Sequence, residues 1–382
     1  MPAIPVMAVF GTRPEAIKLA PVISALRSSP LFVCQVVVTG QHPEMVGRIN
    51  ELFGIVPDTA IDVYSPRSDP GGMVARTLEQ LAPELARLQP RAVLVQGDTS
   101  SALGAGLAAF FAGVPVVHVE AGLRTGNLAA PFPEEGNRRL LSQISALHLA
   151  PTQRNRQNLL TEGIDPASVA VTGNTVIDAL LAAASSDGQV RDSTVRAALQ
   201  SGRRLVLVTA HRRESWGKPM ARIAEALREL AELEPDVGFV LPLHPNPLVR
   251  DVLAPPLRAR ANVYLTEPLD YLDLVRVIQA SALVLTDSGG IQEEAPALGV
   301  PVLVLRDSTE RPEGVAAGNA RLVGAESGRI VEQTRLLLDD AVARQAMAGA
   351  RNPYGDGGAA ARSVAALAEF FGVGRRLPDF AG

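Results

Sequence analysis

The fold of this chain is decided by a ten-residue segment, VMAVFGTRPE, at residues 6–15. Its first half, residues 6–10, is apolar at every position, which is typical of a parallel strand buried on both faces. In its second half, Pro14 suits the first turn of a helix, because its ring fixes φ and it has no N–H to satisfy. The segment therefore predicts a strand that passes through a rigid turn, carrying Arg13, into a helix.

The same plan recurs along the chain. The sequence VTAHRRE at 208–214 closes an apolar run as residues 9–15 do, and QGDTS at 96–100 is echoed by LTDSG at 285–289. Turns favour small and polar residues anyway, so chance also explains the echoes. Strands are expected at 6–10, 33–38, 92–96, 114–119, 147–150, 205–209, 237–243, 263–265, 283–286 and 300–305. Helices are expected at 16–27, 44–53, 72–88, 100–112, 135–145, 153–161, 220–233, 269–280, 291–298, 329–338 and 359–371. This alternation predicts an α/β protein.

The length of 382 residues allows two to three domains. We expect two doubly wound, Rossmann-like domains with a central cleft, because ligands bind such sheets at the carboxyl ends of their strands. The first domain is expected at residues 1–171 with the C-terminal helix of 358–382, and the second at 172–357. Residues 183–191, which are small and polar, are an alternative linker.

Composition excludes several classes of protein. Lys and Arg number 36 against 40 Asp and Glu, a net charge of -4, so no basic face for a nucleic-acid partner is expected. The five His and one Cys exclude a zinc ribbon or a disulfide scaffold, and Cys34 reads as a core residue in a reducing compartment. The N-terminus has no signal-peptide pattern. The uncharged residues 99–119 contain Gly and Pro and read as a buried helix and strand, so a cytoplasmic protein without membrane partners is expected.

One motif resembles a dinucleotide-binding fingerprint but lies in the wrong place for one. Gly104-Ala105-Gly106-Leu107-Ala108-Ala109 fits the dinucleotide-binding fingerprint G-x-G-x-x-G/A. That fingerprint belongs in the turn directly after a strand, whereas these glycines lie inside the following predicted helix. Close packing of the helix is therefore the favoured interpretation.

The turn Thr286-Asp287-Ser288-Gly289-Gly290 lies between a predicted strand and a predicted helix. Free N–H groups and the positive end of the helix dipole would face an anion there, and glycines would let phosphate approach. An ordinary N-cap by Asp or Ser is an equal alternative. Glu294 would either complement the dipole or accept hydrogen bonds from a ribose diol. Arg13 would either clamp a phosphate or form a surface ion pair with Glu15.

Acidic residues follow neighbouring predicted strands. Asp98 and Glu120 should converge at one sheet edge, where paired carboxylates raise one another's pKa and divide acid and base roles. Each of these acids, and Glu134 with them, is alternatively a helix N-cap or first-turn acid. That alternative is strong for Glu134 and Glu135 and weaker for Glu120. Among the histidines, His211 follows a strand beside two arginines, whereas His118 and His148 lie in apolar strands and are expected in the core.

Taken together, these motifs resemble one family. The matches are GTRPE at 11–15 with Lys18, TGQH at 39–42, GDT at 97–99, residues 118–124, residues 133–138, TGNT at 172–175, HRRE at 211–214, residues 287–294, residues 309–313 and NPYGDG at 352–357. The chain is thereby identified as a member of the non-hydrolysing UDP-N-acetylglucosamine 2-epimerases of bacteria. The resemblance spans essentially the whole chain.

The resemblance implies a GT-B fold, a homodimer, and interconversion of UDP-GlcNAc and UDP-ManNAc for cell-envelope polysaccharide synthesis. It implies no cofactor and no metal. In such enzymes UDP is eliminated across C1–C2 to give 2-acetamidoglucal and then adds back, with the proton delivered to the other face. The resemblance assigns Asp98, Glu120, Glu134 and His211 to the catalytic group. Our hypothesis is that the carboxylates move protons on the sugar while His211 assists departure and return of UDP.

Substrate binding also carries over by resemblance. The implied nucleotide-binding residues are Arg13, Lys18, Ser288, Gly289, Gly290, Glu294 and Arg311, beside Asp98, Glu120 and His211 at the sugar. Leu269 and Leu274 stand where the family contacts uracil with a Gln and a Phe, so apolar and backbone contacts are expected there. A second UDP-GlcNAc activates some members, and Gln41, Arg67, Arg212 and His244 match that allosteric site, with Glu44 in place of a Gln.

Three other functions stay open from the residues. A hydrolysing relative would share the elimination and then add water, releasing ManNAc and UDP. A GT-B glycosyltransferase would need an acceptor site and often a basic membrane-docking patch, and the sequence shows neither. A non-catalytic nucleotide-sugar sensor would not need the acids and the histidine.

Overall fold

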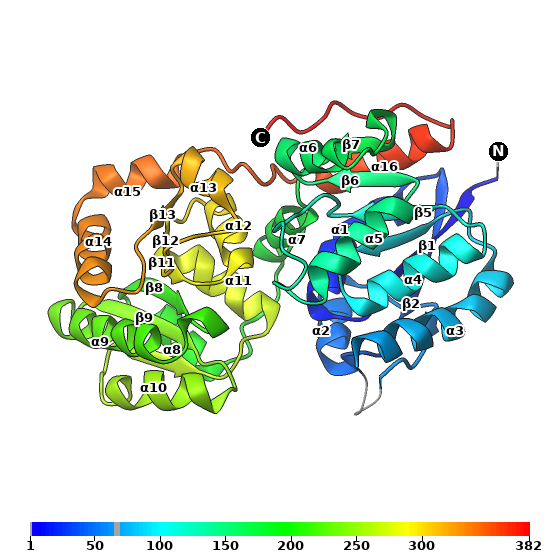
Figure 1. Ribbon diagram of the computed structural model, residues 1–382. Helices are drawn as coiled ribbons and strands as arrows, with labels where there is room; N and C mark the ends of the chain where they lie inside the picture. The colour runs from blue at the N-terminus through cyan, green and yellow to red at the C-terminus, as the bar shows by residue number, and fades with distance from the viewer. Residues whose placement is uncertain (1, 65–68) are drawn as a thin grey trace. The chain divides into compact units, whose positions relative to one another are not determined.

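The computed structural model describes residues 2–64 and 69–382 and divides into two compact units (Figure 1). Unit 1 comprises Met1–Ala179 with Tyr354–Gly382, and unit 2 comprises Leu180–Pro353. Residues 172–179, which the sequence places in the second domain, thus lie in unit 1. Residues 354–357, also placed there from the sequence, lie in unit 1 together with residues 358–382.

Unit 1 is built on a parallel sheet, in which the described residues supply seven strands in the order β3-β2-β1-β4-β5-β6-β7. The strands are β1 (Ile4–Phe10), β2 (Phe32–Val38), β3 (Thr59–Ala60), β4 (Val93–Gln96), β5 (Val116–Val119), β6 (Leu147–Ala150) and β7 (Val169–Val171). Order reverses between β1 and β4, the switch point where doubly wound sheets bind ligands. The predicted strands of this half are confirmed; β3 and β7, at the two sheet edges, were not predicted because they are only two and three residues long.

Helices cover this sheet in two groups. Helices α3 (Pro70–Leu88), α4 (Ser100–Phe111) and α5 (Glu134–Ile144) pack in a row, and α1 (Arg13–Ser28) packs on α2 (Pro43–Phe53) and α16 (Ala359–Phe370). Helix α6 (Gln153–Thr161) completes the unit, and the division into units falls within α7 (Thr175–Ala184). Proline occupies the first turn of α1, α2 and α3, so these helices begin one to three residues before the predicted ranges. Helix α7 was not predicted from the sequence.

Unit 2 repeats the design, with six parallel strands among the described residues in the doubly wound order β10-β9-β8-β11-β12-β13. They are β8 (Arg204–Thr209), β9 (Val237–Pro242), β10 (Val263–Thr266), β11 (Ser281–Thr286), β12 (Val302–Val304) and β13 (Ala320–Leu322). The switch point lies between β8 and β11. Here too the predicted strands are confirmed, and only the three-residue edge strand β13 was missed.

The helices of unit 2 are α8 (Ser193–Gln200), α9 (Lys218–Leu233), α10 (Pro247–Leu257), α11 (Tyr271–Ala280), α12 (Gly289–Ala297), α13 (Pro312–Ala317), α14 (Ser327–Asp339) and α15 (Ala341–Ala348). Helices α9, α11, α12 and α14 were predicted. Helix α10 was missed because Pro255 and Pro256 break the helical pattern near its end, although Asn246 caps it.

The structure confirms the interpretation of the motif at residues 104–109 and of the uncharged stretch. Residues 99–119 form α4 and β5, and the glycines of α4 lie against neighbouring helices. A Cβ at Gly104 would lie 2.7 Å from Thr77 Cβ, and one at Gly106 would lie 2.5 Å from Leu141 Cδ2. The glycines therefore permit close packing of α3, α4 and α5. In the described part of the chain, no helix combines the length and apolar character needed to cross a membrane.

A buried carboxylate fastens the C-terminal helix to unit 1. Asp178 on α7 accepts hydrogen bonds from the backbone N–H groups of Ala359 (3.2 Å) and Ala360 (2.8 Å) at the start of α16. Burial raises the pKa of Asp178, and the two backbone donors oppose that shift. Beyond α16, the N–H of Phe380 donates to the carbonyl of Val171 on the edge strand β7. The segment 359–380 is thus tied to the rest of unit 1 at both ends.

We expect Asp178→Ala to lower the free energy of unfolding by about 1–3 kcal/mol, because it leaves two buried N–H groups of α16 without an acceptor. The matched control is Asp340→Ala, which removes an exposed carboxylate that also accepts from two N–H groups, at the start of α15. Solvent can replace that cap, so we expect a loss of about 1 kcal/mol or less. Urea denaturation measures both; a larger loss for Asp340→Ala would contradict the role given to Asp178.

Candidate active site

In unit 1, the turns after β1 and β4 are joined by a buried glutamate. Oε2 of Glu15 accepts hydrogen bonds from the N–H groups of Gly11 (2.8 Å) and Thr12 (2.7 Å) and from the Thr12 hydroxyl (2.9 Å). Its other oxygen, Oε1, accepts from the hydroxyl of Thr99, next to Asp98. Glu15 thus fixes the position of the turn that carries Arg13 relative to the turn that carries Asp98. Burial raises the pKa of Glu15, and the four donors oppose that shift.

Glu120, directly after β5, is held in a strained conformation among polar partners. Its φ is +64°, a left-handed conformation that few non-glycine residues adopt. Lys18 Nζ lies 2.6 Å from both carboxylate oxygens, and the amides of Gln96 and Asn174 also donate to them. Strain of this kind persists where the surroundings enforce it, commonly at functional sites.

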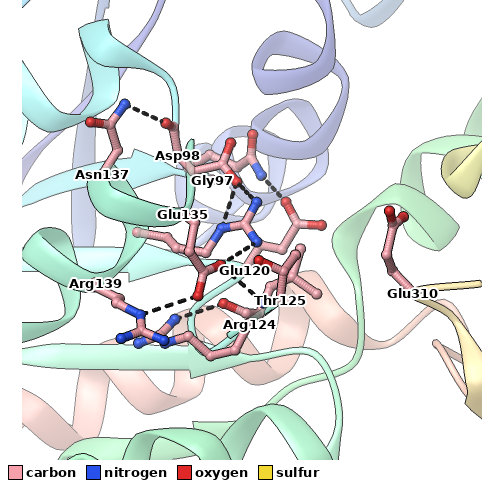
Figure 2. A network of polar contacts seen from close by, with 12 residues as sticks. Gly97, Asp98, Glu120, Arg124, Thr125, Glu135, Asn137, Arg139 and Glu310 are labelled. Atoms are coloured by element: carbon pink, nitrogen blue, oxygen red, sulfur yellow. Dashed lines mark hydrogen bonds and ion pairs between the residues drawn. The ribbon is translucent and has the colours of Figure 1, made fainter. Parts of the chain in front are cut away.

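Asp98, after β4, lies in the same group. Nε of Arg138 donates to its Oδ2 at 2.9 Å, Nη2 of Arg138 also contacts that oxygen, and Asn137 donates to its carbonyl (Figure 2). Burial raises the pKa of Asp98; Arg138 opposes that shift, the negative charge of Glu120 adds to it, and Lys18 opposes it. The structure therefore brings together Asp98 and Glu120, as predicted from the two strand ends, with Lys18 beside them.

Glu135 is fully buried and contacts several donors, although the sequence predicts an ordinary first-turn acid at this position. It accepts from the N–H groups of Thr125 (3.0 Å) and Gly126 (3.2 Å) and contacts Arg138 and Arg139, each at 3.1 Å (Figure 2). Its pKa is lowered, because these donors together outweigh burial, which acts in the opposite direction. Arginines three and four residues after a glutamate were the sequence signal for this role.

Glu134, the first residue of α5, is half-buried. Its Oε2 is shielded from solvent and has no hydrogen-bond partner among the described residues. Such an oxygen is suited to accept a hydrogen bond from a bound molecule.

The core histidines are confirmed, with one exception in their hydrogen bonding. His148 contacts the carbonyls of Ser142 and Ser168 through its two ring nitrogens. His118 contacts the carbonyl of Gly97 at 2.8 Å through Nε2, but its Nδ1 has no partner in the described part of the chain. Burial lowers the pKa of His118 to about 4. His118 is therefore neutral and supports the Gly97 turn beside Asp98.

In unit 2, the turns after β8 and β11 are joined by Asp287. Its Oδ2 accepts from the N–H groups of His211 and Arg212, both at 2.9 Å, and from the Ser215 hydroxyl at 3.3 Å. The His211 ring stacks on His244, with ring centroids 5.7 Å apart and an interplanar angle of 8°. Burial lowers the pKa of His211; Asp287 opposes that shift, and His244 and Arg212 add to it.

The N-terminus of α12 is open to an anion. Ser288 is its N-cap residue, but its side chain makes no capping hydrogen bond. A Cβ at Gly289 would lie 3.4 Å from Nη2 of Arg212 and 3.8 Å from Cζ of Arg311, so two guanidinium groups flank this turn. Backbone N–H groups, the helix dipole and two arginines together form a setting that favours phosphate.

The first turns of α12 carry two buried acids. Glu293 pairs with Nε of Arg311, and Oε1 of Glu294 accepts from the hydroxyl of Tyr271 at 3.1 Å. Oε2 of Glu294 lies 3.8 Å from the Cβ position of Gly290. This places the predicted ribose acceptor directly beside the glycines of the predicted phosphate turn.

The other expected site residues are dispersed. Leu269 is buried, and Leu274 packs against the same apolar cluster of unit 2. Gln41 accepts from Ser101 in unit 1, and Glu44 is exposed in the first turn of α2. Arg67 lies outside the described residues. Within those residues, no cluster of three or more His, Cys, Asp or Glu side chains is arranged to hold a metal ion.

The fold and the site together define the structural class of this protein. Two Rossmann-like units with polar groups at both switch points make this a protein of the GT-B fold. The fold is shared with the glycosyltransferase SnogD from Streptomyces nogalater, with a TM-score of 0.64 at 19% identity over 96% of this chain and 99% of that one.

The chain belongs to the UDP-N-acetylglucosamine 2-epimerase family, whose model matches residues 24–368. It is 47% identical to UDP-N-acetylglucosamine 2-epimerase of Escherichia coli (strain K12) over 369 residues, 95% of this chain and 98% of the relative. The UDP-GlcNAc 2-epimerase of Neisseria meningitidis, solved bound to UDP-GlcNAc, aligns with a TM-score of 0.86 and 43% identity, covering 96% of this chain and all of that one.

The effect of burial on the pKa of Glu15 is testable through the pH dependence of stability. Because burial raises its pKa above the ordinary 4.5, its contribution to stability is complete below pH 4.5 and lost as pH rises through the raised pKa. The Gln side chain of Glu15→Gln stays neutral. As pH rises from 4.5 through the raised pKa, we therefore expect the free energy of unfolding of the variant to increase relative to that of the parent, by up to about 1.4 kcal/mol per pH unit.

Urea denaturation of both proteins between pH 4 and 8 measures this difference. The control is Glu79→Gln, which removes an exposed carboxylate of α3 and should change the stability difference little. A difference between parent and Glu15→Gln that stays constant with pH would rule out a raised pKa.

Proposed function

We propose that this protein interconverts UDP-GlcNAc and UDP-ManNAc without hydrolysis, acting in the cytoplasm as a homodimer that needs no cofactor or metal. The observation that carries the proposal is the pair Asp98 and Glu120 in unit 1, two acids at one sheet edge with different partners. Neighbouring carboxylates in different environments are suited to separate acid and base roles. Family membership and the bound UDP-GlcNAc of the Neisseria relative support the choice of substrate.

Unit 2 would hold the nucleotide. The diphosphate would lie at the N-terminus of α12, against Ser288, Gly289 and Gly290, with Arg311 neutralising its charge. Glu294 would accept hydrogen bonds from the ribose, and Leu269 and Leu274 would pack near uracil. In unit 1, Arg13 at the start of α1 and Lys18 on the same helix would complete the substrate contacts.

The reaction explains why acids and a phosphate site are needed together. The C2–H bond of the sugar is not next to a carbonyl, so its direct deprotonation is prohibitive. A base removes the C2 proton while the C1–O bond breaks, UDP leaves with the electron pair, and a C1–C2 double bond forms in 2-acetamidoglucal. Return of UDP to C1, with a proton delivered to the other face of C2, gives the epimer. The protein supplies proton transfer and charge stabilisation at the leaving oxygen.

The roles follow the geometry of each group. Asp98 and Glu120 would move protons on the sugar, and Glu134 would use its unpartnered Oε2 to contact the same substrate. His211 would assist departure and return of UDP. By the family resemblance, an activating second UDP-GlcNAc would contact Gln41, Glu44, Arg67, Arg212 and His244; rates from UDP-ManNAc with and without added UDP-GlcNAc test this.

Incubation with UDP-GlcNAc in deuterated water tests the reaction itself. We expect UDP-ManNAc carrying deuterium at C2, because the C2 proton is exchanged at a solvent-accessible base before re-addition. Proton NMR follows both products over time. Free ManNAc with UDP would identify a hydrolysing enzyme instead, and absence of turnover would leave a binding protein.

Asp98→Asn and Glu120→Gln test the assignment of the acids. Each should lower kcat by about 10²–10⁴-fold, the usual contribution of general acid–base catalysis. UDP affinity measured by calorimetry should stay near that of the parent, because the phosphate site lies in unit 2. Glu84→Gln, which removes an ion-paired carboxylate from the surface of α3, is the control that should keep full activity. Full activity in both site variants would exclude these roles.

A further inference from the structure

The proposed use of His211 leaves open what controls the position of its proton. An imidazole presents one nitrogen as donor and the other as acceptor, and the hydrogen bond made by one nitrogen sets the state of the other. Three titratable or charged groups face His211: Asp287 after β11, His244 after β9 and the adjacent Arg212. Only Asp287 is an anion.

Asp287 meets His211 in two ways. Its Oδ2 accepts three hydrogen bonds, from the backbone N–H groups of His211 and Arg212 and from the Ser215 hydroxyl. Its Oδ1 lies 3.5 Å from Nδ1 of His211. The Asp287 side chain is completely buried, and Oδ1 accepts no hydrogen bond from any described residue. A buried carboxylate oxygen with one polar neighbour at this distance is positioned to accept its proton.

His244 packs against one face of the His211 ring. His244 stacks on His211, and its own Nδ1 accepts a hydrogen bond from the N–H of Asn246 at 3.2 Å. The stacking and this hydrogen bond hold the two rings in place beside each other. The His211 side chain remains 40% exposed. The exposed part of the ring is therefore free to face a substrate.

We propose that Asp287 is a positioning residue for His211: Oδ2 fixes the 211–212 turn, and Oδ1 keeps a proton on Nδ1, so that Nε2 faces the substrate. This inference rests on the proposed function of His211. In the neutral ring Nε2 then accepts a proton, and in the charged ring Nε2 donates it to the departing UDP oxygen. The carboxylate of Asp287 beside Nδ1 stabilises the charged ring.

Asp287→Asn tests the proposal with little change in shape. The amide oxygen can still accept from the N–H groups of His211 and Arg212, but an NH₂ group replaces the oxygen that faces Nδ1. We expect a lower pKa of the His211 imidazole, because a neutral group replaces the anion. We also expect kcat to fall by about 10²-fold or more, with UDP affinity near that of the parent. The loss of activity with rising pH should move to lower pH.

The matched control is Ser215→Ala, which removes a hydrogen bond to Oδ2 but leaves the charge beside His211. Its His211 pKa and kcat should stay close to those of the parent. The chain has five histidines, so NMR of isotope-labelled histidine resolves His211, with His211→Gln giving the assignment. An unchanged or raised pKa in Asp287→Asn would overturn the proposal.

A measurement on the parent protein keeps the test independent of how the variant folds. In the neutral ring, nitrogen chemical shifts should show the proton of His211 on Nδ1, and a proton mainly on Nε2 would overturn the proposal. These NMR readouts do not require turnover. If they behave as expected while the protein has no epimerase activity, the proposed function fails and the positioning role of Asp287 stands.

Discussion

Each sheet depends on one buried carboxylate that ties together two diverging turns at its switch point. Chain order reverses between β1 and β4 and between β8 and β11, and backbone N–H groups in the turns at these strand ends donate to a side chain. Glu15 satisfies them in unit 1 and Asp287 in unit 2. A carboxyl group suits this position because each of its two oxygens can accept more than one hydrogen bond. The positions of the candidate site residues follow from these two contacts.

The two units solve this problem from opposite ends. In unit 1 the carboxylate comes from the turn after the first strand, and Thr99 reaches it from the turn after β4. In unit 2 the carboxylate comes from the turn after β11 and accepts hydrogen bonds from backbone N–H groups of the turn after β8. The sequence echo between residues 96–100 and 285–289 therefore marks structurally equivalent turns, although Asp98 and Asp287 have different partners. Asp98 faces Arg138, whereas Asp287 holds backbone N–H groups.

Sequence periodicity was sufficient for the strands that carry the site, because strands buried on both faces are apolar throughout and end at small or polar residues. It failed at edge strands β3, β7 and β13, which are too short for a pattern, and at α10, where two prolines disguise a helix. The positions of Asp98 and Glu120 followed from adjacent strand ends. The roles of Glu135 and Asp287 did not, because first-turn and N-cap acids look alike in sequence whether they meet solvent or a buried partner.

The contacts of Glu135 bear on how the two acids of unit 1 differ. Lys18 contacts both oxygens of Glu120, so the negative charge of Glu120 has a cation of its own. Asp98 has Arg138, but Arg138 also contacts Glu135, a buried carboxylate whose pKa is lowered. The charge of one guanidinium is thereby shared between two carboxylates, and burial, together with the negative charge of Glu120, raises the pKa of Asp98. Arg138 thus serves both Glu135 and Asp98, and Asp98 binds a proton more readily than an ordinary aspartate does. In the proposed reaction, two neighbouring acids in different environments would take different parts in moving the proton between the two faces of C2.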